Sequence, residues 1–325
     1  MAECLKDFAL NREIGKEVGI RKIGIVGCGA VGQEIARVTA QHGIDVIFVE
    51  QTKEKQDDVY NKIDAELNNM IDRWGITAGD KRIILSRIIG TTNIEDLKDC
   101  DLVIESISTS KKSAGDAIKA RQDLFKEIEK VVPESTVLSS NASTLLISDL
   151  ASELKHPERM IGLCFMVFPY MVKTVEVVRS VETNEETFRK TCHFVQAIRK
   201  EPVEVKESPG NISTRLLITL INEACEIFLE GTATITGIDN TMKLGYGLQS
   251  GPFEMADKIG IDRIVKYADN LFMEFGLFKF KASPILKRLA RSKQVGRREG
   301  KGFYLYDEKG KNTGPNPSII DYKTI

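Results

Sequence analysis

The sequence lacks both a long apolar run and a net charge of either sign. No apolar stretch approaches the roughly 20 residues that span a bilayer. The 46 basic and 47 acidic side chains nearly cancel, which argues against a general attraction to nucleic acid or to anionic lipid. We therefore expect neither a nucleic acid nor a membrane as a partner.

Metal-binding and disulfide patterns are missing as well. The six cysteines are scattered without CxxC spacing, and the chain has only three histidines. Metal ligands usually follow short spacings, so we expect no metal. Residues 1–20 mix charges and lack the apolar core of a signal peptide. These absences predict a reduced, cytoplasmic protein with a short extension over residues 1–20.

A glycine-rich turn is the most informative segment that is present. Residues 23–26 form an apolar run typical of a buried strand, and three glycines follow it at G-x-G-x-x-G spacing. The first permits a tight turn, the second lets the backbone approach a pyrophosphate, and the third lets the next helix pack on the strand. The residues expected to touch the cofactor here are Gly27, Gly29, Ala30, Val31 and Gly32.

An acidic residue completes this dinucleotide-binding pattern. Residues 46–49 read as a second strand, and Glu50 follows it directly. A carboxylate at this point accepts hydrogen bonds from the adenosine ribose and repels a 2′-phosphate. The pattern predicts NAD as the cofactor rather than NADP.

Strands and helices alternate over the first two thirds of the chain. Further short apolar runs predict strands at 88–90, 102–105, 136–140, 160–165, 174–178 and 202–206. Such alternation is typical of an α/β fold with a doubly wound parallel sheet of Rossmann type. Beyond Lys206 nearly every segment has a helical pattern that ends at a glycine. We therefore predict an NAD-binding domain over 21–206 and an all-helical domain over 207–325.

The predicted helices of the second domain carry more apolar side chains than one buried face of each helix would hold, among them Leu216, Leu220 and Phe228. Apolar surface of this kind is often buried against another subunit. The sequence predicts a homodimer formed through this domain.

A series of further motifs follows along the chain. They are residues 101–106, 140–143, 159–163, 173–178, 208–210, 222–224, 239–245, 251–254 and 300–304. Together with the glycine loop they resemble, over about residues 21 to 306, the L-3-hydroxyacyl-CoA dehydrogenase family, which includes the 3-hydroxybutyryl-CoA dehydrogenases. The resemblance implies a reaction of fatty acid metabolism. In it, hydride moves reversibly between the nicotinamide and C3 of an acyl-CoA substrate.

The resemblance also assigns four catalytic positions. The family's serine and glutamate fall on Ser143 and Glu176. Its histidine base falls on Cys164, and its active-site asparagine falls on Thr214. In the family the histidine takes the hydroxyl proton, the glutamate orients it, and the serine and asparagine hydrogen-bond the reacting oxygen. Val167 replaces a nearby asparagine, while Thr214 still offers a hydroxyl.

The cysteine changes the expected chemistry. A thiol beside a carboxylate has a raised pKa, so Cys164 is a poor general base near neutral pH. A neutral thiol can still give a proton to a developing alkoxide, so reduction suffers less than oxidation. The alternative to a part in proton transfer is that Cys164 is an inert, buried side chain. We expect His42, His156 and His193 to be solvated or structural.

Further cofactor contacts are predicted from the strand ends and from the connection after residue 105. They are Glu105, Asp116, Arg121, Ser140 and Asn141, of which the second and third are assigned by the resemblance. Lys111 and Lys112 in the same connection either meet coenzyme A phosphates or lie in a solvated loop.

Three functions follow from these patterns. The first is an NAD-dependent 3-hydroxyacyl-CoA dehydrogenase of the 3-hydroxybutyryl-CoA type with an altered proton relay. The second keeps the fold and cofactor but takes a different 3-hydroxy substrate. The third is a catalytically impaired NAD-binding regulatory protein.

Overall fold

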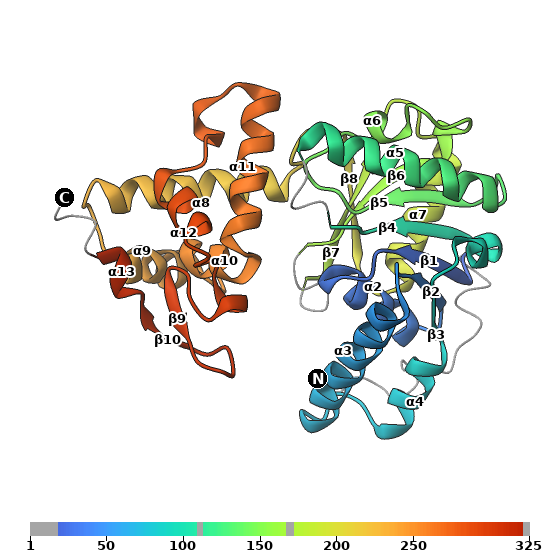
Figure 1. Ribbon diagram of the computed structural model, residues 1–325, viewed down its shortest axis with the longest axis horizontal. Coiled ribbons are helices and arrows are strands. Elements are labelled where there is room, and N and C mark those ends of the chain that lie inside the picture. The colour runs from blue at the N-terminus through green and yellow to red at the C-terminus, as the bar shows by residue number, and fades with distance from the viewer. Residues whose placement is uncertain (1–18, 109–112, 167–171, 321–325) are drawn as a thin grey trace. The chain divides into compact units, whose positions relative to one another are not determined.

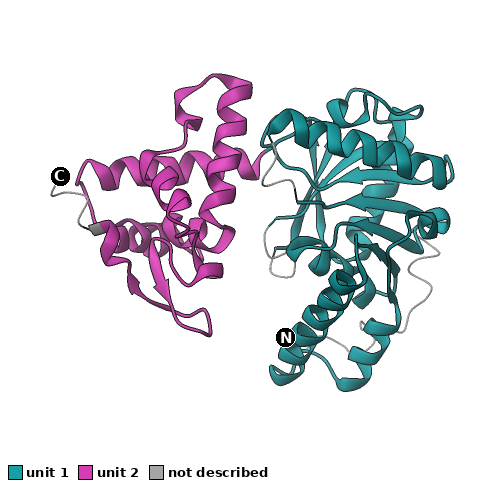
Figure 2. Cartoon of the chain, viewed as in Figure 1, with its two compact units in different colours: residues 1–211 teal, residues 212–325 magenta. Residues whose placement is uncertain are grey.

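The structure is a computed structural model that describes residues 19–108, 113–166 and 172–320. Lys111, Lys112 and Val167, named in the sequence predictions, lie outside the described residues. The chain divides into two compact units, residues 1–211 and residues 212–325 (Figure 2).

The first unit is built around an eight-stranded sheet in the order β3-β2-β1-β4-β5-β6-β7-β8 (Figure 1). The strands are β1 (Lys22–Val26), β2 (Asp45–Val49), β3 (Ile88–Thr91), β4 (Leu102–Glu105), β5 (Val137–Ser140), β6 (Met160–Cys164), β7 (Thr174–Arg179) and β8 (Glu201–Lys206). The order reverses between β1 and β4, so the turn after β1 lies at the topological switch point where α/β sheets bind ligands.

The predicted doubly wound sheet is confirmed, with one antiparallel step. Strands β1 to β6 are parallel, but β7 pairs antiparallel with β6, and β8 then pairs parallel with β7. Residues 165–173 connect β6 to β7. They are too few for a parallel crossover, which needs about a dozen residues or more.

Helices cover both faces of the sheet. They are α2 (Ala30–Gln41), α3 (Lys53–Asp72), α4 (Ala78–Ser86), α5 (Ala114–Val131), α6 (Ile147–Ala151) and α7 (Glu185–Ala197). One buried cluster joins the sheet to α2, α3, α4 and α7, and another joins it to α5 and α6. The 3-10 turns η2 (Ile94–Asp99) and η3 (Pro157–Arg159) complete the unit. Apolar strands buried on both sides are expected for such a layered fold.

The second unit is mainly helical. Its helices are α8 (Ser213–Leu229), α9 (Ile235–Asn240), α10 (Pro252–Ile259), α11 (Ile261–Phe275), α12 (Pro284–Arg291) and α13 (Pro317–Ile320), with the short turns η4 (Thr241–Gly245), η5 (Phe278–Phe280) and η6 (Arg297–Glu299). Their apolar faces meet in one cluster that includes Phe253 and Phe303, whose ring centroids are 4.4 Å apart.

A two-stranded hairpin departs from the all-helical pattern predicted for this unit. It pairs β9 (Tyr304–Tyr306) with β10 (Asn312–Pro315). Asp257 holds the hairpin in place, because its carboxylate accepts from the backbone N–H groups of Phe303 and Tyr304 at 2.9 Å each. Strands this short have too little pattern to be recognised in the sequence.

None of the helices in the described part of the chain combines the length and the apolar character that a membrane crossing requires.

Candidate active site

The glycine loop after β1 has the backbone geometry that its motif requires. Gly27 has a φ of 85°, and a Cβ there would lie 2.8 Å from the Cα of Ile107. A Cβ at Gly32 would lie 2.6 Å from the carbonyl oxygen of Gly27. At Gly29, by contrast, a Cβ would meet nothing within 4 Å. The first and third glycines therefore permit close packing, and the second leaves open space beside the helix start.

That open space faces the N-terminus of α2, where Ala30 and Val31 begin the helix. The first turn of α2 carries no acidic side chain, so its backbone N–H groups favour an anion. Glu50 lies beside the loop, and its Oε1 accepts from the Cys28 N–H at 2.6 Å. In dinucleotide-binding proteins a carboxylate at this point of the motif accepts from a ribose hydroxyl. These residues fit the diphosphate and the adenosine ribose of a dinucleotide.

Three of the predicted cofactor contacts bond to one another. Glu105 ends β4 with its side chain fully buried, and its Oε2 accepts from Arg121 Nε at 2.9 Å and from Ser140 Oγ at 2.6 Å. Its Oε1 accepts from the N–H of Ile107 at 2.7 Å. A buried carboxylate of this kind is tolerated because each oxygen is hydrogen-bonded and a cation is paired with it. The cluster fixes the ends of β4 and β5 next to the glycine loop.

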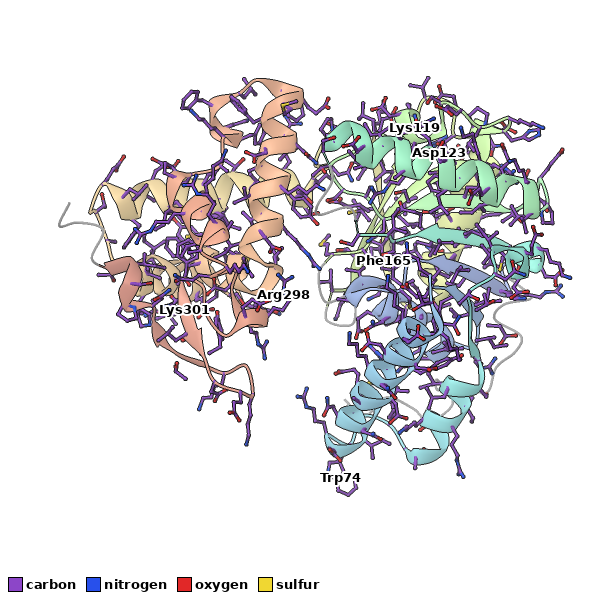
Figure 3. All side chains as sticks on the ribbon, in the orientation of Figure 1. Trp74, Lys119, Asp123, Phe165, Arg298 and Lys301 are labelled. Atoms are coloured by element: carbon purple, nitrogen blue, oxygen red, sulfur yellow. The ribbon has the colours of Figure 1, made fainter. Side chains whose placement is uncertain are left out.

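Asp116 and Asn141 have different surroundings. Asp116 is exposed in the first turn of α5, where its carboxylate accepts from Ser113 Oγ at 2.7 Å. Asn141 Oδ1 accepts from the N–H of Phe165 at 2.8 Å, which ties the end of β5 to the residue after β6 (Figure 3). Ser113 is the N-cap of α5, and its Oγ accepts from the Asp116 N–H at 3.1 Å. The contact of Asp116 with a cofactor stays a prediction.

Cys164 and Glu176 form the centre of the candidate catalytic site. They are directly opposite each other in the antiparallel pairing of β6 with β7, and both are buried. This pairing places the thiol next to the Glu176 carboxylate. Burial first, and the Glu176 charge second, raise the pKa of the Cys164 thiol to about 12. The thiol is therefore protonated throughout the physiological range.

A residue that the sequence predictions did not name also affects this thiol. Asn211 is 8% exposed, and its side-chain amide partly opposes the rise in the pKa of the Cys164 thiol. Asn211 has a φ of 47°, and Gly210 before it has a φ of 80°. Asparagine tolerates the left-handed region better than most residues. The signal in the sequence is an asparagine directly after Ser-Pro-Gly, three positions before Thr214.

The turn at Gly210 is also bonded to the backbone of Ser143. The Gly210 N–H donates to the Ser143 carbonyl at 2.9 Å, and the Ser143 side chain is half-buried. The structure thus bonds Ser143 to the turn at Gly210 and places Cys164 opposite Glu176. Thr214 belongs to the second unit, where it is buried near the start of α8. Its catalytic role stays a prediction.

The three histidines lie in other parts of the first unit. His42 Nδ1 lies 2.8 Å from the Val38 carbonyl, and burial lowers its pKa. His156 lies 3.2 Å from Glu158, and His193 is exposed on α7. Within the described residues, no group of three or more His, Cys, Asp or Glu side chains is arranged to hold a metal ion.

A cationic cleft of about 470 Å³ is the second notable feature of the first unit. Arg73, Lys173, Arg199 and Lys200 line it, together with Arg37, which is paired with Glu34 at 2.9 Å. Glu66 is the acid among the lining residues, and His42, whose pKa burial lowers, also lines the cleft. Burial lowers the pKa of Lys200, and the nearby Arg37 charge lowers it further. So much positive charge in a protein that is nearly neutral overall favours an anionic ligand.

Trp74 lies in the sequence between two residues that line this cleft, Arg73 and Gly75. It is 96% exposed with a φ of 59°, at the tip of the α3–α4 hairpin (Figure 3). A bulky residue held in the left-handed region is strained, and such strain often marks a functional position.

Comparison with known protein families gives two matches that together cover most of the chain. Residues 22–208 match the 3-hydroxyacyl-CoA dehydrogenase NAD binding domain. Residues 210–306 match the 3-hydroxyacyl-CoA dehydrogenase C-terminal domain.

Individual proteins give the same result. The chain is 35% identical to a 3-hydroxybutyryl-CoA dehydrogenase of Clostridioides difficile over 287 residues, which is 88% of this chain and 100% of the relative. It is 31% identical to the mitochondrial hydroxyacyl-coenzyme A dehydrogenase of Homo sapiens, covering 90% of this chain and 93% of the relative. Among solved structures, (S)-3-hydroxybutyryl-CoA dehydrogenase PaaH1 of Ralstonia eutropha superposes with a TM-score of 0.80 at 31% identity, covering 89% of this chain and 100% of that chain.

Proposed function

Because the chain belongs to the 3-hydroxyacyl-CoA dehydrogenase family, we propose that this NAD-dependent oxidoreductase interconverts acetoacetyl-CoA and 3-hydroxybutyryl-CoA and favours reduction. One observation carries the preferred direction. The group that lies opposite Glu176 is the buried, protonated thiol of Cys164. A protonated acid serves reduction, whereas oxidation needs a base.

In reduction, NADH when bound supplies the hydride to C3, and the chain supplies the proton. The S–H bond of Cys164 breaks as an O–H bond forms on the substrate oxygen, and the sulfur regains its proton from solvent. In the reverse direction the thiolate would have to accept that proton. With a thiol pKa of about 12, only about one site in 100,000 holds a thiolate at pH 7.

Hydroxyl groups complete the proposed site. The side chain of Ser143 lies on the loop that receives the Gly210 hydrogen bond, and its hydroxyl would donate to the carbonyl oxygen being reduced. Thr214 is in the second unit, and its predicted role as a second donor rests on the family resemblance alone. Donors aimed at an oxygen that becomes negative stabilise the transition state more than the ground state.

A direct assay tests this function. Purified protein with NADH and acetoacetyl-CoA should consume NADH faster than a no-enzyme control, and the oxidation of 3-hydroxybutyryl-CoA should be much slower. Binding of both ligands without turnover would support the catalytically impaired NAD-binding protein instead. Turnover restricted to free 3-oxo acids would support a different substrate.

The cationic cleft suggests where the coenzyme A portion of the substrate binds. We propose that its phosphate groups contact the basic residues of the cleft and that Trp74 stacks on its adenine. Lys173 lines the cleft, and Glu176 follows it along β7. These two positions are about 10 Å apart along the strand, so one extended substrate reaches from the thiol of Cys164 into the cleft.

Charge reversal in the cleft tests this placement. We expect Arg73→Glu to raise KM for acetoacetyl-CoA about tenfold with little change in kcat, because a phosphate contact away from the reacting carbon contributes mainly to binding. The truncated substrate acetoacetyl-N-acetylcysteamine lacks the nucleotide, so its KM should stay constant. Arg82→Glu makes the same charge change at an exposed position of α4 and is the matched control. An equal KM increase with both substrates would contradict the placement.

We also propose a homodimer formed through the second unit. Several large apolar side chains of this unit are exposed, including Leu216 at 67%, Met273 at 78% and Phe278 at 77%. Exposed apolar groups in this number are typical of a surface that another subunit covers. Light scattering should give the mass of a dimer, and a monomer at micromolar concentration would contradict it.

A further inference from the structure

A side chain from the neighbouring strand end holds the backbone beside Cys164. The pairing of β5 with β6 ends at Ser140 and Gly162, whereas β6 itself continues to Cys164. Phe165 comes next and is 5% exposed, and its backbone N–H donates to Asn141 Oδ1 at 2.8 Å. A buried N–H group without an acceptor is costly. The Asn141 side chain thus extends the hydrogen bonding between the two strands past the end of β5.

The backbone that carries this acceptor is itself fixed. The Asn141 N–H donates to the Glu105 carbonyl at 2.9 Å. On one side of Asn141, the Ser140 hydroxyl donates to the buried Glu105 carboxylate at 2.6 Å. The same hydroxyl accepts from the Ala142 N–H, on the other side, at 3.1 Å. Asn141 Oδ1 is therefore a preorganised acceptor.

Asn141 also connects the two groups proposed to act on the substrate oxygen. Ser143 follows it by two residues in the chain, and its side chain bonds to the residue directly after Cys164. In the proposed reduction, the Ser143 hydroxyl donates a hydrogen bond to that oxygen and the Cys164 thiol gives it a proton. Both groups must reach one atom, so their relative position matters to the rate.

We propose that Asn141 is a positioning residue, whose side-chain carbonyl holds the backbone next to Cys164 in register with the loop that carries Ser143. This role rests on the proposed reductase function. In that reaction the S–H bond of Cys164 breaks and an O–H bond forms on the substrate oxygen, while NADH supplies the hydride and solvent returns a proton to sulfur. Without the Asn141 bond the thiol would shift relative to Ser143, and a displacement of about 1 Å in such a site lowers the rate about 100-fold.

Substitutions at Asn141 separate this role from the predicted cofactor contact, which would use the amide nitrogen. Leucine has nearly the same shape without either polar atom, and aspartate keeps an acceptor oxygen but lacks the N–H donors. We expect Asn141→Leu to lower kcat for acetoacetyl-CoA reduction about tenfold to 100-fold, with KM and the Kd for NADH nearly constant. Asn141→Asp should keep kcat within about threefold of the wild type, because the acceptor remains. Asn61→Leu, exposed on α3, is the matched control and should retain full activity.

Hydrogen exchange of the Phe165 amide gives a readout that does not depend on activity. The rate should rise at least about tenfold in Asn141→Leu and stay close to the wild-type rate in Asn141→Asp, because only the first loses the acceptor. Asn141→Ala removes the same oxygen without comparable bulk and should behave like the leucine variant. It provides the test if the leucine variant does not fold.

The outcomes distinguish the role of Asn141 from the reductase function. Unchanged Phe165 exchange in an active Asn141→Leu or Asn141→Ala protein, or equal kcat losses with leucine and aspartate, would overturn the positioning role alone. Weaker NADH binding at constant kcat in these variants would also overturn it, in favour of a cofactor contact. A wild-type protein that binds both ligands without turnover would overturn the reductase function and, with it, the effect on kcat.

Discussion

Replacing Cys164 with histidine is expected to raise kcat for the oxidation of 3-hydroxybutyryl-CoA by about 100-fold or more. Oxidation needs a base, and the thiol of Cys164 has a pKa of about 12. An imidazole has an ordinary pKa near 6.5, so a large fraction is neutral and able to accept a proton at pH 7. Glu176, opposite this position on β7, is placed to orient the ring. Initial rates of NADH formation measure the gain.

The pH dependence of this variant gives a second test. Only the neutral imidazole accepts a proton, so the oxidation rate of Cys164→His should rise with pH through the imidazole pKa and then level off. The affinity for NADH should stay constant. Cys192→His, on α7 and outside the site, is the matched control and should show no gain. A folded Cys164→His protein without increased oxidation would indicate that Glu176 serves a different substrate.

Replacing Arg121 with methionine is expected to lower the free energy of unfolding by about 3–5 kcal/mol. Arg121 is the cation paired with the fully buried Glu105 carboxylate, at an Nε to Oε2 distance of 2.9 Å. Its removal leaves a buried negative charge without compensation. The affinity for NADH should fall as well, because Glu105 also holds Ser140 at the end of β5. Urea denaturation and NADH titration measure the two effects.

Lys119→Met is the matched control on the same helix. Lys119 is exposed and pairs with Asp123 and Glu153 on the surface (Figure 3), where solvent screens such pairs. Its substitution should leave the free energy of unfolding nearly unchanged. The double substitution of Glu105→Gln with Arg121→Met should recover part of the lost stability, since it removes the unpaired charge. If Arg121→Met and Lys119→Met lowered the free energy of unfolding equally, the burial of the Arg121–Glu105 pair would not contribute to stability.

The cofactor end of the site was largely predictable from sequence because it depends on local backbone geometry. A glycine is needed where φ is 85° at Gly27, and Gly32 is needed where the helix approaches the carbonyl oxygen of Gly27. Both requirements involve residues close together in the chain, so spacing alone reveals them. Glu105 and Arg121 were also named from sequence, but their pairing with each other was not, because it joins a strand to the following helix.

The arrangement of the catalytic residues was less predictable from the sequence than that of the cofactor-binding residues. The resemblance located Cys164 and Glu176, but their direct opposition depends on the antiparallel turn from β6 to β7. Asn211 was not named because its burial depends on the left-handed turn after β8. The β9–β10 hairpin was missed because Asp257, distant in sequence, organises it.

By itself, the sequence determined the glycine loop, the acidic residue after the second strand, the α/β pattern and the family. Each of these is encoded in short-range spacing or in the order of motifs. Only the tertiary structure decided that buried Cys164 lies opposite Glu176, and that basic residues from separate segments line one cleft. The physical reason is that burial, charge and hydrogen bonding at one atom depend on residues far apart in the chain, which spacing cannot specify.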